Sequence, residues 1–293
     1  MDERTALRLL AADLPGAGDD AAIVDGLVVT TDMLHEATDF PDGTTRYTAG
    51  WRAVGASLSD VAAMGATATC AVAVYAAAEL DETELRDFVQ GARDVCEAVS
   101  AEYVGGDLDT HREFTTVSTA IGRTDDPVLR SGARPGDLLC VTGELGRSAA
   151  AVRLFDAGET ERANDLFRFT PRVAAGVRLA ASATAMMDSS DGLARSVHQL
   201  AEASECGFEL DWDALPVHDA VDEVATDAAD RRDLSAYFGE DFELVFTIPE
   251  DELAAVRDDV AVPLTVVGRV TEDETIVADG EPLPDRGYTH GGD

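Results

Sequence analysis

Residues 183–193 read ATAMMDSSDGL, a small apolar run that leads into Asp188-Ser189-Ser190-Asp191-Gly192. The run predicts a buried strand, and apolar residues recur at helical spacing over positions 193–201. Strand, acidic turn and helix in this order are typical of a ligand site at the carboxyl end of a sheet. Capping of the helix by Ser190 or Asp191 would account for one of the two aspartates, but not for both. We therefore expect an α/β fold with a functional site at this turn.

Other aspartates also stand in apolar or glycine-flanked contexts, where a solvated carboxylate is not usually found. They are Asp19, Asp20, Asp32, Asp60 and Asp107. A carboxylate in such a place is costly unless a positive charge meets it. The chain contains no lysine, and all 22 of its basic residues are arginines. A metal ion is therefore the favoured partner, and Mg²⁺ is the first candidate.

A hairpin is predicted near the N-terminus. Residues 21–31 (AAIVDGLVVTT) form two short strand patterns around Asp25-Gly26, a dipeptide that suits a tight turn. Asp20 precedes the first strand and Asp32 follows the second. A hairpin brings its outer ends together, so we expect these two carboxylates to be neighbours in space.

The rest of the first half alternates between helix and strand patterns. Residues 48–64 predict a helix ended by Gly65, residues 69–76 a strand, and residues 83–100 a second helix. Residues 105–107 (GGD) come next. Two glycines allow the backbone to approach a ligand closely, and Asp107 would deliver a charge there.

A polar stretch with proline and glycine, residues 124–136, predicts a domain boundary. We expect domains at 1–124 and 125–293. The second begins with a strand at 137–142, then GELG at 143–146 before a helix. A glycine-rich turn at a helix N-terminus can bind phosphate, but G-x-x-G alone is more often a tight turn.

An acidic turn is expected near the end of the chain as well. Residues 238–246 (FGEDFELVF) predict a turn that enters a strand, with Phe242, Leu244 and Phe246 on one face. A solvated turn in an acidic protein would explain Glu240 and Asp241 equally well.

Composition narrows the function. The 58 acidic residues give a formal net charge of −36, which is typical of a surface adapted to high salt, as in a haloarchaeal cytoplasm. Such a charge argues against nucleic acid as a partner. The absence of lysine excludes Schiff-base chemistry and a P-loop. No signal-like N-terminus is present, and the longest apolar stretch, residues 71–78, is too short to span a membrane. We expect a soluble, cytoplasmic protein.

Seven segments, taken in order, resemble the motifs of the thiamine-monophosphate kinase family. They are residues 18–22 (GDDAA), 30–34 (TTDML), 58–66 (LSDVAAMGA), 105–107 (GGD), 130–137 (RSGARPGD), 188–193 (DSSDGL) and 239–244 (GEDFEL). The resemblance implies the two-domain fold of the aminoimidazole-ribonucleotide synthetase-like superfamily, of α+β type, with an N-terminal domain that binds ATP and Mg²⁺ and pairs in a homodimer. It also implies transfer of the γ-phosphoryl group of ATP to thiamine monophosphate.

The same resemblance implies roles for individual residues. Metal ligands would be Asp20, Thr30, Thr31, Asp32, Asp60, Asp107, Asp188 and Asp191. Nucleotide contacts would be Gly106, Asp107, Arg130 and Ser190. Substrate contacts would be Asp39, where many members carry histidine before phenylalanine, Glu240 and Tyr288.

Catalysis would need no general base, because the second pKa of the attacking phosphate is about 6. Asp107, Arg130 and Asp191 would act electrostatically, by positioning charge around the transferred group.

Two alternatives fit part of the pattern. Another superfamily member would use ATP on a different small molecule, such as selenide, a formylglycinamidine ribonucleotide or a carbamoylated cysteine. The chain lacks the N-terminal reactive Cys and Lys and the C-terminal cysteine that two of those reactions favour. A non-catalytic acidic scaffold would bind metal without nucleotide, but it gives no reason to place residues 105–107 (GGD) and 188–192 (DSSDG) at strand ends in separate domains.

Overall fold

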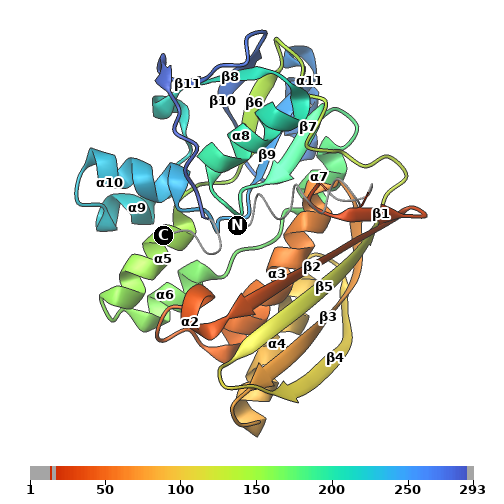
Figure 1. Cartoon of the computed structure of the whole chain (residues 1–293), viewed down its shortest axis with the longest axis vertical. Helices are drawn as coiled ribbons and strands as arrows, with labels where there is room; N and C mark the ends of the chain where they lie inside the picture. The colour runs from red at the N-terminus through yellow and green to blue at the C-terminus, as the bar shows by residue number, and fades with distance from the viewer. Residues whose placement is uncertain (1–13, 15–17, 289–293) are drawn as a thin grey trace.

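The computed structural model describes Leu14 and residues 18–288 of the 293-residue chain. The outer limits of both expected domains, residues 1 and 293, lie outside the described residues. Two sheets with packed helices make up the fold, and the predicted mixed α/β class is confirmed (Figure 1).

The first sheet has five strands in the order β1-β2-β5-β3-β4. These are β1 (Ala22–Val24), β2 (Leu27–His35), β3 (Thr67–Ala77), β4 (Glu102–Thr110) and β5 (Thr115–Arg123). Strands β1 and β2 pair antiparallel, and the turn between them has Asp25 at φ 51° and Gly26 at φ 74°. Two residues in the left-handed region are what a tight hairpin turn requires, so the predicted hairpin is confirmed.

Within the described part of the chain, three helices accompany this sheet: α2 (Glu36–Asp39), α3 (Arg46–Ala63) and α4 (Glu82–Ala98). Helix α3 ends before Gly65, whose φ of 65° suits a residue without a side chain. Figure 1 shows α3 and α4 against the same face of the sheet. Strand β2 alternates accordingly: Val28 and Thr30 are buried on the helix side, whereas Thr31 and Met33 on the opposite side are exposed.

The second sheet has seven strands in the order β12-β11-β8-β10-β6-β9-β7. They are β6 (Leu138–Thr142), β7 (Ala185–Asp188), β8 (Gly207–Leu210), β9 (Leu244–Ile248), β10 (Leu264–Thr271), β11 (Ile276–Ala278) and β12 (Glu281–Pro282). Its helices are α5 (Arg147–Asp156), α6 (Thr160–Phe167), α7 (Val173–Leu179), α8 (Leu193–Ser204), α9 (Asp219–Val224), α10 (Ala228–Arg232) and α11 (Glu250–Asp259). A 3-10 turn at Trp212–Ala214 and a π-helical turn at Asp233–Tyr237 complete the elements.

Both faces of the second sheet are covered. Leu139 and Val141 of β6 pack with α8, while Cys140 between them packs with α7 and α11. The cluster on the α7 side also includes Leu58 and Val61 of α3, so one apolar core runs from the first sheet into the second. This continuity fixes the two halves against each other at the place where the acidic motifs meet.

Two details of the predicted elements are wrong. Phe242 does not lie on the strand: β9 begins at Leu244, all five of its residues are buried, and Phe242 has a left-handed φ of 54°. Residues Gly105, Gly106 and Asp107 lie inside β4 rather than at the end of a strand. A Cβ on Gly106 would stand 1.7 Å from the carbonyl oxygen of Ala73, so the close pairing of β3 and β4 accounts for this glycine.

The described residues include no helix that is both long and apolar enough to cross a membrane.

Candidate active site

Three carboxylates from distant parts of the chain converge between the two halves. Asp20 precedes β1, Asp60 lies on the last turn of α3, and Asp188 ends β7; one oxygen of each lies within 4.8 Å of the others. Thr30 of β2 donates its hydroxyl to Asp60 over 2.6 Å. The predicted neighbours Asp20 and Asp32 line one cavity, and both charges act on Asp60.

The cluster is strained electrostatically. Burial, followed by the charges of Asp188 and Asp20, raises the pKa of Asp60 well above its ordinary value. Burial and then the charge of Asp20 raise the pKa of Asp188 to about 7. Like charges held together out of water disfavour the ionised form unless a cation joins them.

The donor set fits a hard divalent cation. Asp188 is 1% exposed, and its Oδ2 has no hydrogen-bond partner among the described residues. An orphaned buried carboxylate oxygen beside two further carboxylates is a place for a ligand that brings positive charge. Oxygen donors from separate elements, rather than one closed cage, suit Mg²⁺, which keeps water and phosphate oxygens in its shell.

Among the described residues, Arg130 is the only one with a basic side chain that forms an ion pair with this cluster. Its Nε donates to one oxygen of Asp20 over 3.2 Å and its Nη2 to the other over 3.0 Å. Burial alone would lower the pKa of Arg130, but the charge and hydrogen bonds of Asp20 raise it above its ordinary value. Asp19 accepts the backbone N–H of Arg130 over 2.8 Å. Asp19 and Asp20 of the GDDAA motif thus both bind Arg130 of the RSGARPGD motif.

The two acidic turns of the second half are joined by their backbones. Glu240 donates its N–H to the carbonyl of Ser190 over 2.7 Å, and Ser189 donates its N–H to the carbonyl of Glu243 over 2.8 Å. A Cβ on Gly239 would stand 2.4 Å from the carbonyl oxygen of Ser190. Glycine is required here by the close approach of the two turns, which places Asp191 and Glu240 on the same cavity.

The C-terminal tail, at Tyr288, and the short helix α2, at Asp39, also line the cavity. The Tyr288 N–H donates to the carbonyl of Asp191 over 3.1 Å, and its hydroxyl donates to Asp39 over 3.4 Å. Asp39 also accepts from the His35 N–H and the Thr38 hydroxyl. The C-terminal tail therefore crosses the site and contacts α2 of the first half.

The structure brings most of the sequence-predicted site residues to this one cavity. Its lining comprises Asp20, Thr30, Thr31, Asp32, Leu34, Asp39, Ala56, Asp60, Ser190, Asp191, Glu240, Phe242 and Tyr288. Asp188 and Arg130 contact it through Asp20 and Asp60.

Gly106 and Asp107 are not brought to the cavity. They lie on the edge strand β4, separated from β2 by β5 and β3, and Asp107 is exposed. Neighbouring strands are about 4.8 Å apart, so β4 is on the order of 14 Å from β2 across the sheet.

The GELG turn does not offer a phosphate site. The N–H groups of Gly146 and Ser148, at the start of α5, donate to the two oxygens of Asp241 over 2.5 and 3.0 Å. An internal carboxylate therefore already occupies this helix N-terminus.

The sequence analysis did not predict two features of the site, its apolar lining and the ion pair of Arg52. Leu34, Ala56 and Phe242 line the cavity, and Arg52 reaches Glu240 from α3. A signal existed for Arg52, since α3 (RYTAGWRAVGASLSDVAA) has only two other charged residues, Arg46 and Asp60. A lone arginine within such a buried helix must have a partner.

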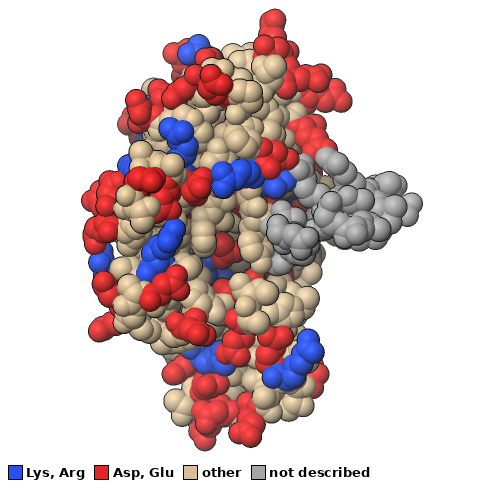
Figure 2. All heavy atoms as spheres, turned by 60° about the vertical axis from the view of Figure 1, so that its left-hand side comes forward, with Lys and Arg blue, Asp and Glu red and all other residues tan. Residues whose placement is uncertain are grey.

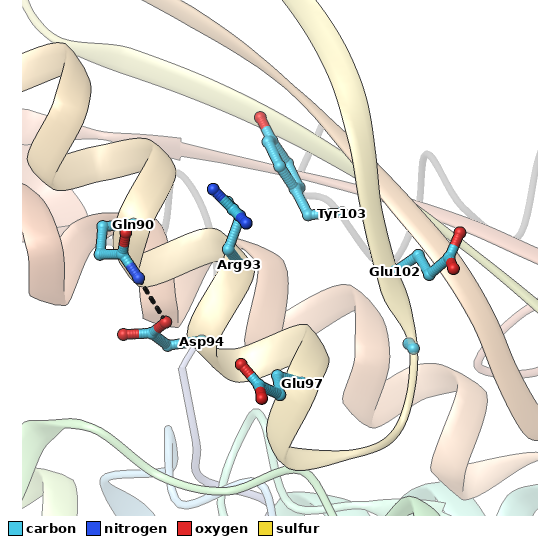
Figure 3. Close-up of a pocket in the computed structure, with 7 residues that line it drawn as sticks. Gln90, Arg93, Asp94, Glu97, Glu102 and Tyr103 are labelled. Carbon is cyan, nitrogen blue, oxygen red and sulfur yellow. Dashed lines mark hydrogen bonds between the residues drawn. The ribbon is translucent and has the colours of Figure 1, made fainter.

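A second pocket lies outside this site. Gln90, Arg93, Asp94, Glu97, Glu102 and Tyr103 line it beside α4 and β4 (Figure 3). Asp94 accepts hydrogen bonds there from Gln90 and from the Tyr47 hydroxyl. None of the predicted site residues belongs to it.

Family models match both halves of the chain. The model for the N-terminal domain of AIR synthase related proteins matches residues 18–124, and the model for the C-terminal domain matches residues 134–280.

Similar proteins span the full length. The chain is 62% identical to a thiamine-monophosphate kinase of Halobacterium salinarum over 99% of its length and 100% of the relative. It is 41% identical to one of Methanospirillum hungatei over 99% of both chains. A solved structure described as AaThiL complexed with AMPPCP and TMP matches with a TM-score of 0.89 and 28% identity, over 99% of this chain and 97% of that one.

Proposed function

The chain belongs to the thiamine-monophosphate kinase family, and on that premise we propose how its residues transfer the γ-phosphoryl group of ATP to thiamine monophosphate. The proposed reaction is a direct, in-line phosphoryl transfer assisted by Mg²⁺, with thiamine diphosphate and ADP as products. The observation that carries it is the Asp20, Asp60 and Asp188 cluster, whose buried oxygen lacks a partner among the described residues.

We assign the metal ligands to residues that surround this cluster. They are Asp20, Thr30, Thr31, Asp32, Asp60, Asp188 and Asp191. Asp107, which lies on β4 away from this cluster, would join the metal ligands of a second copy in a dimer. Mg²⁺ held by these residues would supply positive charge to offset two polyanionic substrates, in a chain that has no lysine to do so. Acids from β2, α3, β7 and the turn after β7 hold that charge at the junction of the two halves.

We assign the nucleotide to the Arg130 side of the cavity. Arg130 and Ser190 form the part of this proposed set that lies there, and Gly106 and Asp107, which lie on β4 away from this cavity, would contact the nucleotide of a second copy in a dimer. Arg130 can turn its planar fork from Asp20 to phosphate oxygens, which it binds in the same two-pronged geometry.

The thiamine moiety is assigned to the opposite end. We assign to it Asp39, Glu240 and Tyr288, which line the cavity together with Leu34 and Phe242, so the lining combines carboxylates with apolar and aromatic surface. A thiazolium ring is a flat cation, and such a lining matches it in charge and shape.

No general base is assigned. The attacking group is a phosphate oxygen that is largely ionised at neutral pH, since its second pKa is about 6. The protein's contribution is to orient two substrates and to offset their charge, with Asp107, Arg130 and Asp191 in electrostatic roles.

We also propose that the protein is a homodimer with domains at 1–124 and 125–293. The face of the first sheet opposite α3 and α4 carries a row of partly or fully exposed residues, Met33, Val117, Val74 and Asp107, paired across neighbouring strands. A second copy placed on this face would cover its apolar part, and would stand beside Asp107.

A salt-rich cytoplasm is the proposed setting. Figure 2 shows acidic side chains spread over most of the visible surface, with arginines between them. At the formal net charge of −36, repulsion between these groups is screened only at high ionic strength, and nucleic acid is disfavoured as a partner.

The test is a thiamine diphosphate assay with ATP, Mg²⁺ and thiamine monophosphate in multi-molar potassium chloride. Free thiamine and aminoimidazole precursors serve as parallel substrates. Mg²⁺-dependent product from the monophosphate alone is the expected result. A folded, ATP-binding protein without this product would indicate another superfamily substrate, and a protein without ATP binding would indicate a scaffold.

A further inference from the structure

Arg52 is a buried cation that no part of the proposed mechanism uses. Its side chain, on α3, is 2% exposed, and its guanidinium carbon lies 3.6 Å from the centroid of the Phe167 ring. Phe169 and Phe242 flank it, with their ring centroids 5.3 and 5.6 Å away. A guanidinium enclosed by aromatic rings is tolerated only where its charge is met and its N–H groups are bonded.

The charge is met by Glu240. Arg52 donates Nη2 to Glu240 Oε2, and Nη1 to the carbonyl of Phe167 over 2.6 Å and to Ser148 Oγ over 3.3 Å. The ion pair joins α3 of the first half to the acidic turn of the second half, 188 positions away. Glu240 is less enclosed than Arg52, with 25% of its side chain exposed, and it lines the active-site cavity.

The turn that carries Glu240 has an unusual backbone. Gly239, Glu240 and Phe242 have φ values of 86°, 63° and 54°, so three residues of four are left-handed. For residues with a side chain this conformation persists only when the surroundings impose it. Arg52 and Ser148 both bond the Glu240 carbonyl, and Phe242 stacks on Phe169 with ring centroids 4.2 Å apart.

The pairing leaves one carboxylate oxygen for a ligand. Oε2 of Glu240 is taken by Arg52, whereas Oε1 has no hydrogen-bond partner among the described residues. With its charge offset by Arg52, this oxygen acts as a fixed hydrogen-bond acceptor. Asp39, on the same cavity, has no arginine ion-pair partner among the described residues and accepts hydrogen bonds from the His35 N–H, the Thr38 hydroxyl and the Tyr288 hydroxyl.

We propose that Arg52 is a positioning residue that holds Glu240 as an acceptor for an N–H group of the phosphoryl acceptor. This proposal rests on the proposed function, and it divides the recognition of thiamine monophosphate between the carboxylates of Glu240 and Asp39. Glu240 binds an amine on the aminopyrimidine ring, and Asp39 faces the thiazolium charge.

The test compares Arg52→Lys with Arg86→Lys. Arg52→Lys keeps the positive charge but loses the planar guanidinium, which donates several N–H groups and packs on the aromatic rings. The second changes an exposed arginine that pairs with Glu82 on the surface of α4. Both are first checked for folding by circular dichroism melts, and KM is then measured separately for ATP and for thiamine monophosphate. Glu240→Gln is measured alone and combined with Arg52→Lys.

We expect Arg52→Lys to raise KM for thiamine monophosphate by about tenfold or more, the loss typical of a hydrogen bond to a charged group. KM for ATP should change by less than about twofold, and Arg86→Lys should match the wild type. Because Arg52 acts through Glu240, the double variant should be no worse than the poorer single variant.

An analogue with a carbonyl in place of the pyrimidine amine gives a second readout. The wild type should discriminate against this analogue, and Arg52→Lys should reduce that discrimination. A parallel rise in both KM values, or additive effects in the double variant, would overturn the role of Arg52. An inactive wild type would instead overturn the proposed function.

Discussion

Arg130 grips both carboxylate oxygens of Asp20, with donor-acceptor distances of 3.2 and 3.0 Å. The guanidinium therefore offsets part of the repulsion within the Asp20, Asp60 and Asp188 cluster before any nucleotide or metal joins it. Phosphate oxygens and a divalent cation can replace both partners of this pair at once. On the proposed function, the ion pair would link metal binding to nucleotide binding in one region of the cavity.

Replacement of Arg130 by glutamine tests that link. We expect Arg130→Gln to destabilise the metal-free protein by about 3 kcal/mol, because a buried carboxylate loses its counter-charge. Saturating Mg²⁺ should recover part of the loss, while affinity for ATP should fall at least about tenfold. Melting curves with and without Mg²⁺, together with calorimetric titration of ATP, measure both effects. Arg134→Gln, an exposed arginine nearby, is the control. An unchanged metal-free melting temperature would contradict the argument.

Replacement of Asp188 separates metal binding from folding. Asp188 is deprotonated at pH 8, above its pKa of about 7, and its buried charge then costs stability without a cation. Asp188→Asn should make the metal-free protein more stable at pH 8, yet abolish the rise in melting temperature that Mg²⁺ gives the wild type. Asp125→Asn, at an exposed position, should leave both quantities unchanged. A full Mg²⁺ response in Asp188→Asn would remove Asp188 from the metal site.

Stability should depend on pH through Asp241. Burial, against two bonds from backbone N–H groups, raises the pKa of Asp241 to about 7. Its unfolded pKa is about 3.9, so between these values the folded state binds more protons and stability falls as pH rises. Asp241→Asn should reduce this slope by up to about 1.4 kcal/mol per pH unit between pH 4 and 7. Thermal unfolding in the presence of Mg²⁺ at several pH values between 4 and 7 measures this slope. An unchanged slope in Asp241→Asn would show that Asp241 is not the group responsible.

Local patterns predicted the parts of the site that depend on neighbours in sequence. The Asp25-Gly26 turn fixes the hairpin that brings Asp20 and Asp32 to one cavity. The apolar run before Asp188 is enough to predict β7. In both cases a turn or a strand of a few residues determines where the carboxylate lies, so no distant contact is needed.

Contacts between distant residues could not be predicted in this way. The ion pairs of Arg130 with Asp20 and of Arg52 with Glu240 join residues 110 and 188 positions apart. The GGD motif was misplaced for a different reason. Gly106 is needed for the close pairing of β4 with β3, and a glycine demanded by packing has the same sequence signal as one demanded by a ligand.

Asp107 gives a test of function that leaves folding untouched. Its side chain is exposed on β4 and, among the described residues, accepts only the Leu108 N–H. Asp107→Asn should therefore leave the melting temperature unchanged, while kcat falls by about 100-fold or more if the carboxylate holds a metal. Asp109→Asn, two positions along the same strand and also exposed, is the matched control. Near-normal turnover in Asp107→Asn would count against its assigned role.

The open face of the first sheet should be a dimer interface. Val117 lies at its centre, between Met33 on β2 and Val74 on β3, and Val74 is paired in turn with Asp107. A charge placed there would be desolvated against a second copy, so Val117→Asp should convert a dimer into a monomer. Val177→Asp introduces the same charge at an exposed position of α7 and should leave the dimer intact. Sedimentation in multi-molar potassium chloride distinguishes the two. If Asp107 acts at the site of the second copy, the Val117→Asp monomer should lose turnover to the same extent as Asp107→Asn. A fully active monomer would instead show that the site of each subunit is complete without its partner.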